Sequence, residues 1–222
     1  MDASDSGEDR GRERPPGISA RSEGKRRAIA DAATEAFLTN GYTRTSMDDI
    51  ARLAHVSKQT IYMHFGDKER LLFAVLMEIM GAASTPFDDE IHLLGASDDL
   101  DHDLREHARQ QLALVLQPRP LQLRRLVIAE AASFPQLGRS FYELGPGRTI
   151  KELAVAFRRL DERGLLQIVD AKRAASDFNW LIMSEPINKA MLLGDDRAPS
   201  RSSIAKWADQ AVRTFLAAYR TS

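Results

Sequence analysis

The apolar positions of the chain recur at helical spacing, most clearly between residues 201 and 220. Apolar side chains follow one another there at intervals of three and four residues over four turns, the period of a helix with one buried face. They are Ile204, Trp207, Ala208, Ala211, Val212, Phe215, Leu216 and Tyr219. No segment shows the alternation typical of a β-strand, and no internal repeat is present. The pattern therefore predicts an all-α protein.

Further helices are predicted along the rest of the chain. They cover approximately residues 25–40, 46–54, 58–64, 67–83, 98–117, 119–132, 135–144, 146–163 and 171–193. Glycines at 41 and 164 follow the ends of two of them, where a left-handed residue commonly closes a helix. Pro86 is expected to mark the end of the fourth helix and Pro186 to kink the helix that contains it, because proline lacks a backbone donor.

Two short capped helices joined by a tight turn are predicted within residues 44–68. Thr45 and Ser46 are hydroxyl N-caps, each followed three residues later by an aspartate, so either register starts the first helix. The turn falls at His55, after which Ser57 caps the second helix. Together with the helix over 25–40, these elements predict a three-helix domain around one small core.

The second short helix should present a face rich in hydrogen-bonding groups. A cation, an amide, hydroxyls and an aromatic ring lie on it, and these groups suit phosphates and base edges in a major groove. The members are Ser57, Lys58, Gln59, Thr60, Tyr62 and His64. Asp67 then caps the next helix and places Lys68 in its first turn, close to where a phosphate would lie.

Residues 24–72 resemble the N-terminal domain of the TetR/AcrR family of bacterial transcriptional regulators. The matching positions are Phe37, Gly41, Tyr42, Thr45, Ser46, Ile50, Ala51, Ala54, Val56, Ser57, Ile61, Tyr62, His64, Phe65, Lys68, Glu69 and Leu71. His55 departs from the pattern, since it stands where the family most often has glycine. A histidine can adopt the left-handed conformation at some cost, so the fold is expected to survive with a strained turn.

The resemblance implies that Thr45 and Lys68 hold phosphates and that the face of the second short helix lies at the groove. The predicted DNA-binding set is Thr45, Ser46, Ser57, Lys58, Gln59, Thr60, Tyr62, His64 and Lys68. Two of these have structural alternatives. The alternative for Tyr62 is packing on the helix surface, and the alternative for His64 is a hydrogen bond with a neighbouring backbone group.

Composition is consistent with a cytoplasmic protein of two domains. There are 222 residues, no cysteine, and no apolar run long enough to span a membrane. The formal net charge is only −1, so any electrostatic footprint on DNA must be local. Residues 10–27 hold seven basic side chains against two acidic ones. We expect residues 1–22 to be a disordered charged tail, residues 23–68 to be the DNA-binding domain, and residues 69–222 to be an effector-binding and dimerisation domain. The arginines of the tail either reach a minor groove or are solvated without a specific contact.

The helices over about 171–193 and 201–220 are predicted to pair with a second copy in a four-helix interface. A two-fold axis then doubles the base contacts on a palindrome. The alternative is that both apolar stripes complete the core of the monomer. Residues 124–183 more weakly resemble the C-terminal domain of AefR-like members, a resemblance that identifies no ligand. An unidentified small-molecule effector is expected to bind in a mostly apolar pocket among the middle helices. Candidate pocket residues are Phe134, Phe141, Tyr142, Phe157, Phe178, Trp180 and Met183, although composition alone favours the hydrophobic core for each of them.

The sequence offers little support for an enzyme. The cluster of acids and histidines at 98–107 suggests a metal site only superficially, and no nucleophile elbow, phosphate-binding loop or dinucleotide fingerprint is present. We therefore expect no catalytic residues, no metal and no cofactor. The leading hypothesis is a homodimeric repressor released from a palindromic operator by a small molecule. The competing one is a protein-interaction module that retains the helix-turn-helix as a scaffold.

Overall fold

The computed structural model describes residues 18–194 and 199–221, without the side chains of 18–20 and 82–90. The described residues form helices and no strand. One isolated antiparallel bridge connects Leu166 with Arg220. The helices are α1 (Ile18–Asn40), α2 (Met47–Leu53), α3 (Lys58–Phe65), α4 (Lys68–Leu94), α5 (Leu100–Val115), α6 (Pro118–Glu130), α7 (Pro135–Leu144), α8 (Pro146–Glu162), α9 (Ala171–Leu193) and α10 (Arg201–Tyr219). The prediction of an all-α fold is confirmed.

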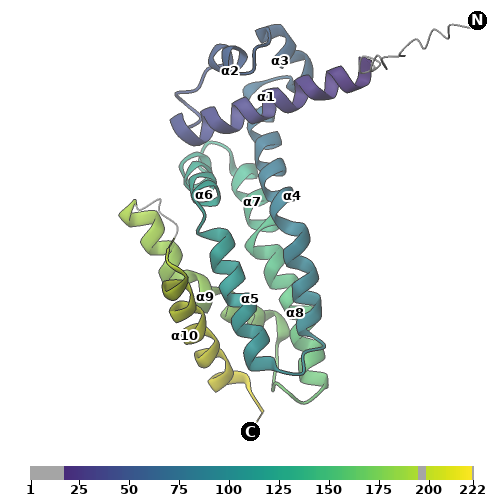
Figure 1. Cartoon of the computed structure of the whole chain (residues 1–222), viewed down its shortest axis with the longest axis vertical. Coiled ribbons are helices and arrows are strands. Elements are labelled where there is room, and N and C mark those ends of the chain that lie inside the picture. The colour runs from purple at the N-terminus through teal and green to yellow at the C-terminus, as the bar shows by residue number, and fades with distance from the viewer. Residues whose placement is uncertain (1–17, 195–198, 222) are drawn as a thin grey trace, which may run out of the picture.

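Helices α1, α2 and α3 form a head at one end of the molecule, and α4 leads from it down the length of a helical body (Figure 1). Helices α6 and α7 stand between the head and the rest of the body, while α9 and α10 pack together along one side. Among the described residues, no helix combines the length and apolar content needed to cross a membrane.

Local sequence signals explain where the helices of the head begin. The Ser46 hydroxyl accepts a hydrogen bond from the Asp49 amide (3.1 Å), and the Asp49 carboxylate accepts one from the Ser46 amide (3.2 Å). This reciprocal capping box selects Ser46 rather than Thr45 as the N-cap of α2. Ser57 caps α3 and Asp67 caps α4 through their side chains, as predicted.

Two predicted boundaries are wrong. Helix α4 continues past Pro86 to Leu94, where Ile91 and Leu94 are buried in the core of the body. Burying two such side chains contributes about 3 to 6 kcal/mol, enough to offset one proline in a helix. Helix α1 begins at Ile18, so 18–22 are helical rather than part of a disordered tail. The remainder of the predicted tail, residues 1–17, lies outside the described part of the chain.

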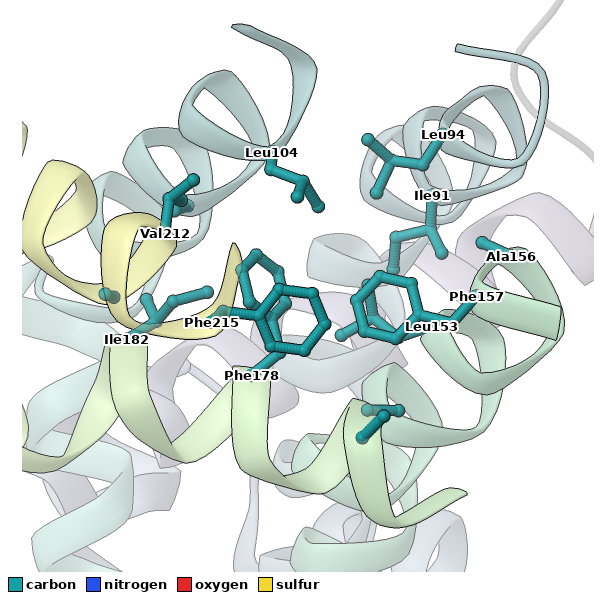
Figure 2. Packing of buried hydrophobic residues seen from close by; sticks show 14 of the residues in the cluster. Ile91, Leu94, Leu104, Leu153, Ala156, Phe157, Phe178, Ile182, Val212 and Phe215 are labelled. Atoms are coloured by element: carbon teal, nitrogen blue, oxygen red, sulfur yellow. The ribbon is translucent and has the colours of Figure 1, made fainter. Parts of the chain in front are cut away.

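A large hydrophobic core fills the body. Three phenylalanine rings meet at its centre, with ring centroids 5.5 Å apart for Phe157 and Phe178 and 4.8 Å apart for Phe178 and Phe215 (Figure 2). They come from α8, α9 and α10, so one aromatic cluster ties the last three helices together.

A second core joins the head to the body. Ile29 and Phe37 of α1 and Ile61 of α3 pack in one cluster with Leu126 of α6 and Leu137 of α7. The three helices of the head therefore do not close their core alone, contrary to expectation. The boundary proposed at residue 68 is crossed by continuous apolar packing.

The prediction that the apolar stripe of the last helix forms a dimer surface also needs correction. Ala208, Ala211, Val212, Phe215 and Leu216 are buried within a single chain. The apolar stripe of α9 is buried in the same way, except for Leu181, which is 39% exposed; its buried members are Ala174, Ala175, Phe178 and Ile182. The alternative of a monomer core therefore holds for the buried residues, and a contact with a second copy would use the exposed side chains of α9 and α10.

Candidate functional site

The turn between α2 and α3 sets the angle at which α3 is presented. His55 has φ = 54°, in the left-handed region, and is the sole non-glycine residue with positive φ in the described chain. The Val56 amide donates to the carbonyl of Ala51 (3.0 Å), which closes the turn. The strained histidine anticipated from the sequence is thus present.

Replacing His55 with glycine is expected to raise the free energy of unfolding by about 1 kcal/mol, because glycine adopts positive φ without steric cost. Urea unfolding followed by circular dichroism measures this change. His55→Ala is the matched control, since alanine loses the same side chain but keeps the strain. Equal stability of the two variants would contradict the prediction.

Helix α3 presents a polar face to solvent while its other face anchors it. Ile61 and Phe65 are buried in the core of the head. Lys58 and Gln59 are exposed, and Tyr62 is 44% exposed rather than packed away. Met63, which the sequence analysis did not select, is 76% exposed on the same short helix. Met63 follows Tyr62 directly and lies on the side of α3 away from Ile61 and Phe65, so its spacing from the buried residues indicated that it would be exposed.

Hydroxyl and imidazole groups complete the predicted face of α3. The Ser57 hydroxyl accepts from the Thr60 amide (3.1 Å) and lies 2.7 Å from the Thr60 hydroxyl, so both are held at the start of the helix. His64 is half-buried, with its ring centroid 6.4 Å from that of Phe65.

Carboxylates of α2 lie beside this face. The Lys58 ammonium pairs with Asp48 at 2.8 Å, and this hydrogen bond raises the pKa of Lys58 above its usual value. Asp49 pairs with Arg52 at 2.9 Å, and its hydrogen bonds with Ser46 and Arg52 lower the pKa of its carboxyl group. Lys58 must therefore exchange Asp48 for a phosphate if it contacts DNA.

Thr45 does not occupy the place that the resemblance implied. Thr45 is only 2% exposed, and its hydroxyl is hydrogen-bonded with the carbonyls of Gly41 (2.8 Å) and Ala36 (3.1 Å). The hydroxyl locks the end of α1 to the start of α2, so we remove the Thr45 side chain from the phosphate-contacting set. Ser46 remains exposed at the N-terminus of α2.

Lys68 lies at the joint between the head and the body. Its ammonium is 4.1 Å from the centroid of the Tyr42 ring, and the Tyr42 ring packs edge-on against Phe134 at 5.0 Å. Burial lowers the pKa of Lys68, an effect opposed by the charge of Glu130. The start of α4, the end of α1 and the α6–α7 corner thus meet around one tyrosine.

A cavity of about 110 Å³ lies among α4, α5, α6, α7, α8 and α9. Its lining is mainly apolar and comprises Ile79, Met80, Gln111, Leu114, Val115, Pro120, Leu123, Arg124, Phe141, Leu144, Gly145, Pro146, Arg148, Thr149, Asn179 and Met183. Of the seven candidate pocket residues, Phe141 and Met183 line it.

The other five candidates lie elsewhere. Phe157 and Phe178 are fully buried in the core of the body, and Phe134 packs on Tyr42. Tyr142 and Trp180 are exposed. These placements correct the predicted set, because apolar spacing identifies residues that are buried but not those that border a gap.

Three polar side chains that the sequence analysis missed give this cavity its chemistry. The Gln111 amide donates to the Asn179 side-chain oxygen (2.8 Å), and both residues are buried. Gln111 Oε1 and Asn179 Nδ2 have no hydrogen-bond partner in the described part of the chain. The Arg124 guanidinium stacks 5.1 Å from the centroid of Phe141, and burial lowers its pKa.

Comparison with known proteins identifies two matching segments. A family model described as bacterial regulatory proteins of the tetR family matches residues 29–75, and one described as the C-terminal domain of AefR-like transcriptional repressors matches residues 102–221.

Two solved structures resemble nearly the whole chain. A putative TetR-family transcriptional regulator from Mesorhizobium loti is 37% identical, with a TM-score of 0.83, over 93% of this chain and 100% of that one. The flavonoid-responsive regulator FrrA is 30% identical, with a TM-score of 0.65, over 88% and 97%.

Curated relatives match over shorter stretches. The DNA-binding transcriptional repressor TetR of Mycobacteroides abscessus is 39% identical over 32% of this chain and 36% of its own length. The transcriptional activator FasR of Mycolicibacterium smegmatis is 32% identical over 52% of this chain and 58% of its own length. The chain thus spans less than two thirds of these relatives.

Proposed function

The chain belongs to the TetR family of bacterial transcriptional regulators, a family of regulators rather than enzymes, and from this premise we propose that it is a homodimeric repressor whose operator binding ends when a small molecule enters the cavity. The observation that carries the proposal is the exposed polar face of α3, held on a rigid core at the end of the molecule. The cytoplasmic location expected from the sequence belongs to the same proposal.

The DNA contacts follow from the placement of α3. Lys58 and Gln59 lie in its first turn, where a helix inserted N-terminus first brings side chains to the major groove. Tyr62 and His64 lie further along the helix, while Ser46 and Lys68 border it at the starts of α2 and α4. With Ser57 and Thr60, they form the proposed contact set.

Dimerisation rests on the outer side of α9. Trp180 and Leu181 are large apolar side chains left 40% and 39% exposed, and Leu192 is exposed about three turns further along. Helix α10 runs beside α9, so the two can meet their counterparts in a second copy as a four-helix interface. Such a dimer presents two copies of α3, which suit successive major grooves when they lie about 34 Å apart.

Helices α4 and α6 are the proposed route from the cavity to the head. Ile79 and Met80 of α4 line the cavity, and the same helix begins at Lys68 beside Tyr42. Leu123 of α6 borders the cavity and also belongs to the core that contains α1 and α3. A ligand that favours a shifted position of these helices would change the separation of the two α3 helices.

Selection from a random DNA library with the purified protein, at two salt concentrations, tests the function. We expect enrichment of a two-fold-symmetric site whose affinity falls steeply with salt, because Lys contacts with phosphates release counterions. Failure to enrich any site at low salt would contradict specific DNA reading by the ligand-free protein. Persistent binding to another protein instead would favour the scaffold hypothesis.

Variants at Lys58 and Asp48 should change operator affinity in opposite directions. Lys58→Ala is expected to weaken binding about tenfold, as loss of a phosphate or base contact costs roughly 1 to 3 kcal/mol. Asp48→Asn removes a negative charge from the DNA-facing side and frees Lys58, so binding should strengthen. Fluorescence anisotropy with the selected operator measures both. The dimer must remain intact in each case, and parallel losses of affinity would show that the ion pair is structural.

A further inference from the structure

The cavity holds a half-buried positive charge that has no acidic partner among the described residues. Arg124 extends from α6 into the lining, and its one specific contact with the described residues is the face of Phe141. No aspartate or glutamate is found among the described residues that line the cavity. An arginine stays protonated in proteins, so this charge is carried at a desolvation cost that only an anion can recover fully.

A second observation points to a ligand at the same cavity. Gln111 and Asn179 are hydrogen-bonded to each other, but Gln111 Oε1, an acceptor, and Asn179 Nδ2, a donor, have no partner among the residues that the structure describes. Unsatisfied buried polar atoms are rare in folded proteins because each costs free energy. A hydroxyl group can satisfy both atoms, since it donates one hydrogen bond and accepts another.

The volume limits the size of the occupant. At about 110 Å³, the cavity is smaller than those that hold drug-sized molecules and close to the roughly 150 Å³ that accommodates a benzene ring. The side chains of Ile79, Leu114, Leu123 and Met183 supply an apolar wall for a body of that size.

From these three features we infer that the effector is a compact hydroxy acid, whose carboxylate pairs with Arg124 and whose hydroxyl meets the amides of Gln111 and Asn179, on an apolar body about one ring in size. The planar guanidinium offers two parallel donors that match a carboxylate. The inference rests on the proposed function, because it assigns the chemistry of the ligand that acts at this cavity.

Matched acids and amides test the inference on the unmodified protein. The probes are 2-, 3- and 4-hydroxybenzoate, each beside its hydroxybenzamide, titrated calorimetrically into full-length dimer at pH 7.5. We expect at least one acid to bind, with its amide about tenfold weaker or more, the factor typical of a charge-assisted hydrogen bond. Benzoate should bind more weakly than the best hydroxybenzoate. Absence of binding by all three acids, or amides as tight as the acids, would overturn the inference, and benzoate as tight as the best acid would overturn the role of the hydroxyl.

Variants on α6 then locate the carboxylate. Arg124→Gln should abolish the preference for acid over amide, and Arg124→Lys should retain part of it because a positive charge remains without the planar fork. Arg119→Gln is the matched control, since Arg119 is exposed on the same helix and outside the cavity lining. An unchanged preference in Arg124→Gln would contradict the assignment. Direct titration needs no DNA, so failure of acid binding is distinguished from failure of operator selection.

Discussion

Leu181→Glu is expected to convert the protein to a monomer and to lower its affinity for the operator by about 100-fold or more, the scale on which linked binding sites exceed single ones. Leu181 lies on the outer side of α9 next to α10, where it is 39% exposed in one chain. In the proposed dimer that side chain is covered, and an unpaired carboxylate there would be desolvated without compensation.

Light scattering coupled to gel filtration gives the mass of the variant, and anisotropy with the selected operator gives its affinity. Val169→Glu is the matched control, because Val169 is fully exposed in the loop before α9 and should tolerate the charge. Circular dichroism should show both variants folded, since neither residue lies in the core. A dimeric Leu181→Glu protein with normal operator affinity would place the interface elsewhere.

The titration of His107 is expected to lower the free energy of unfolding by about 3 kcal/mol as the pH falls from 6.5 to 4. His107 is buried on α5 against Phe178, with ring centroids 6.1 Å apart, and burial lowers its pKa from 6.5 to about 4. The unfolded chain binds a proton near pH 6.5, whereas the folded chain resists it until about pH 4. The contribution is therefore complete above pH 6.5 and is lost as the pH falls through this window.

Urea unfolding at half-unit intervals of pH measures the slope. His107→Leu should flatten the decline between pH 6.5 and 4.5, whatever its effect on stability at pH 7. His102→Leu is the control, because His102 is exposed in the first turn of the same helix and should leave the slope unchanged. A steep decline that survives in His107→Leu would assign the acid sensitivity to other groups.

The elements best predicted from the sequence are those with local signals at both ends. Helix α7 begins at Pro135 and ends at Leu144, as expected from a proline at its start and a glycine after its end. The capped starts at Ser57 and Asp67 were equally clear. Helix α4 was misjudged because the effect of Pro86 is local, whereas the burial of Ile91 and Leu94 depends on contacts with distant segments.

The candidate sites show the same division between local and distant information. The exposed face of α3 follows from the buried positions of Ile61 and Phe65, so it was predictable from spacing. The burial of Thr45 was not, because its hydroxyl is bonded to carbonyls on α1. Most of the aromatic residues predicted to line the cavity lie elsewhere. Gln111 and Asn179, two amides among buried apolar residues of their helices, were a better signal for the cavity lining.

The core shared by α1, α3, α6 and α7 has a consequence for engineering new specificities. A head transplanted from another regulator would bring an apolar surface fitted to its own α6 and α7, and mismatched side chains would leave voids or clashes. Recombination at residue 68 would cut through this packing. Altering operator choice is therefore better attempted by exchanging only the exposed side chains of α3, which leaves the shared core intact.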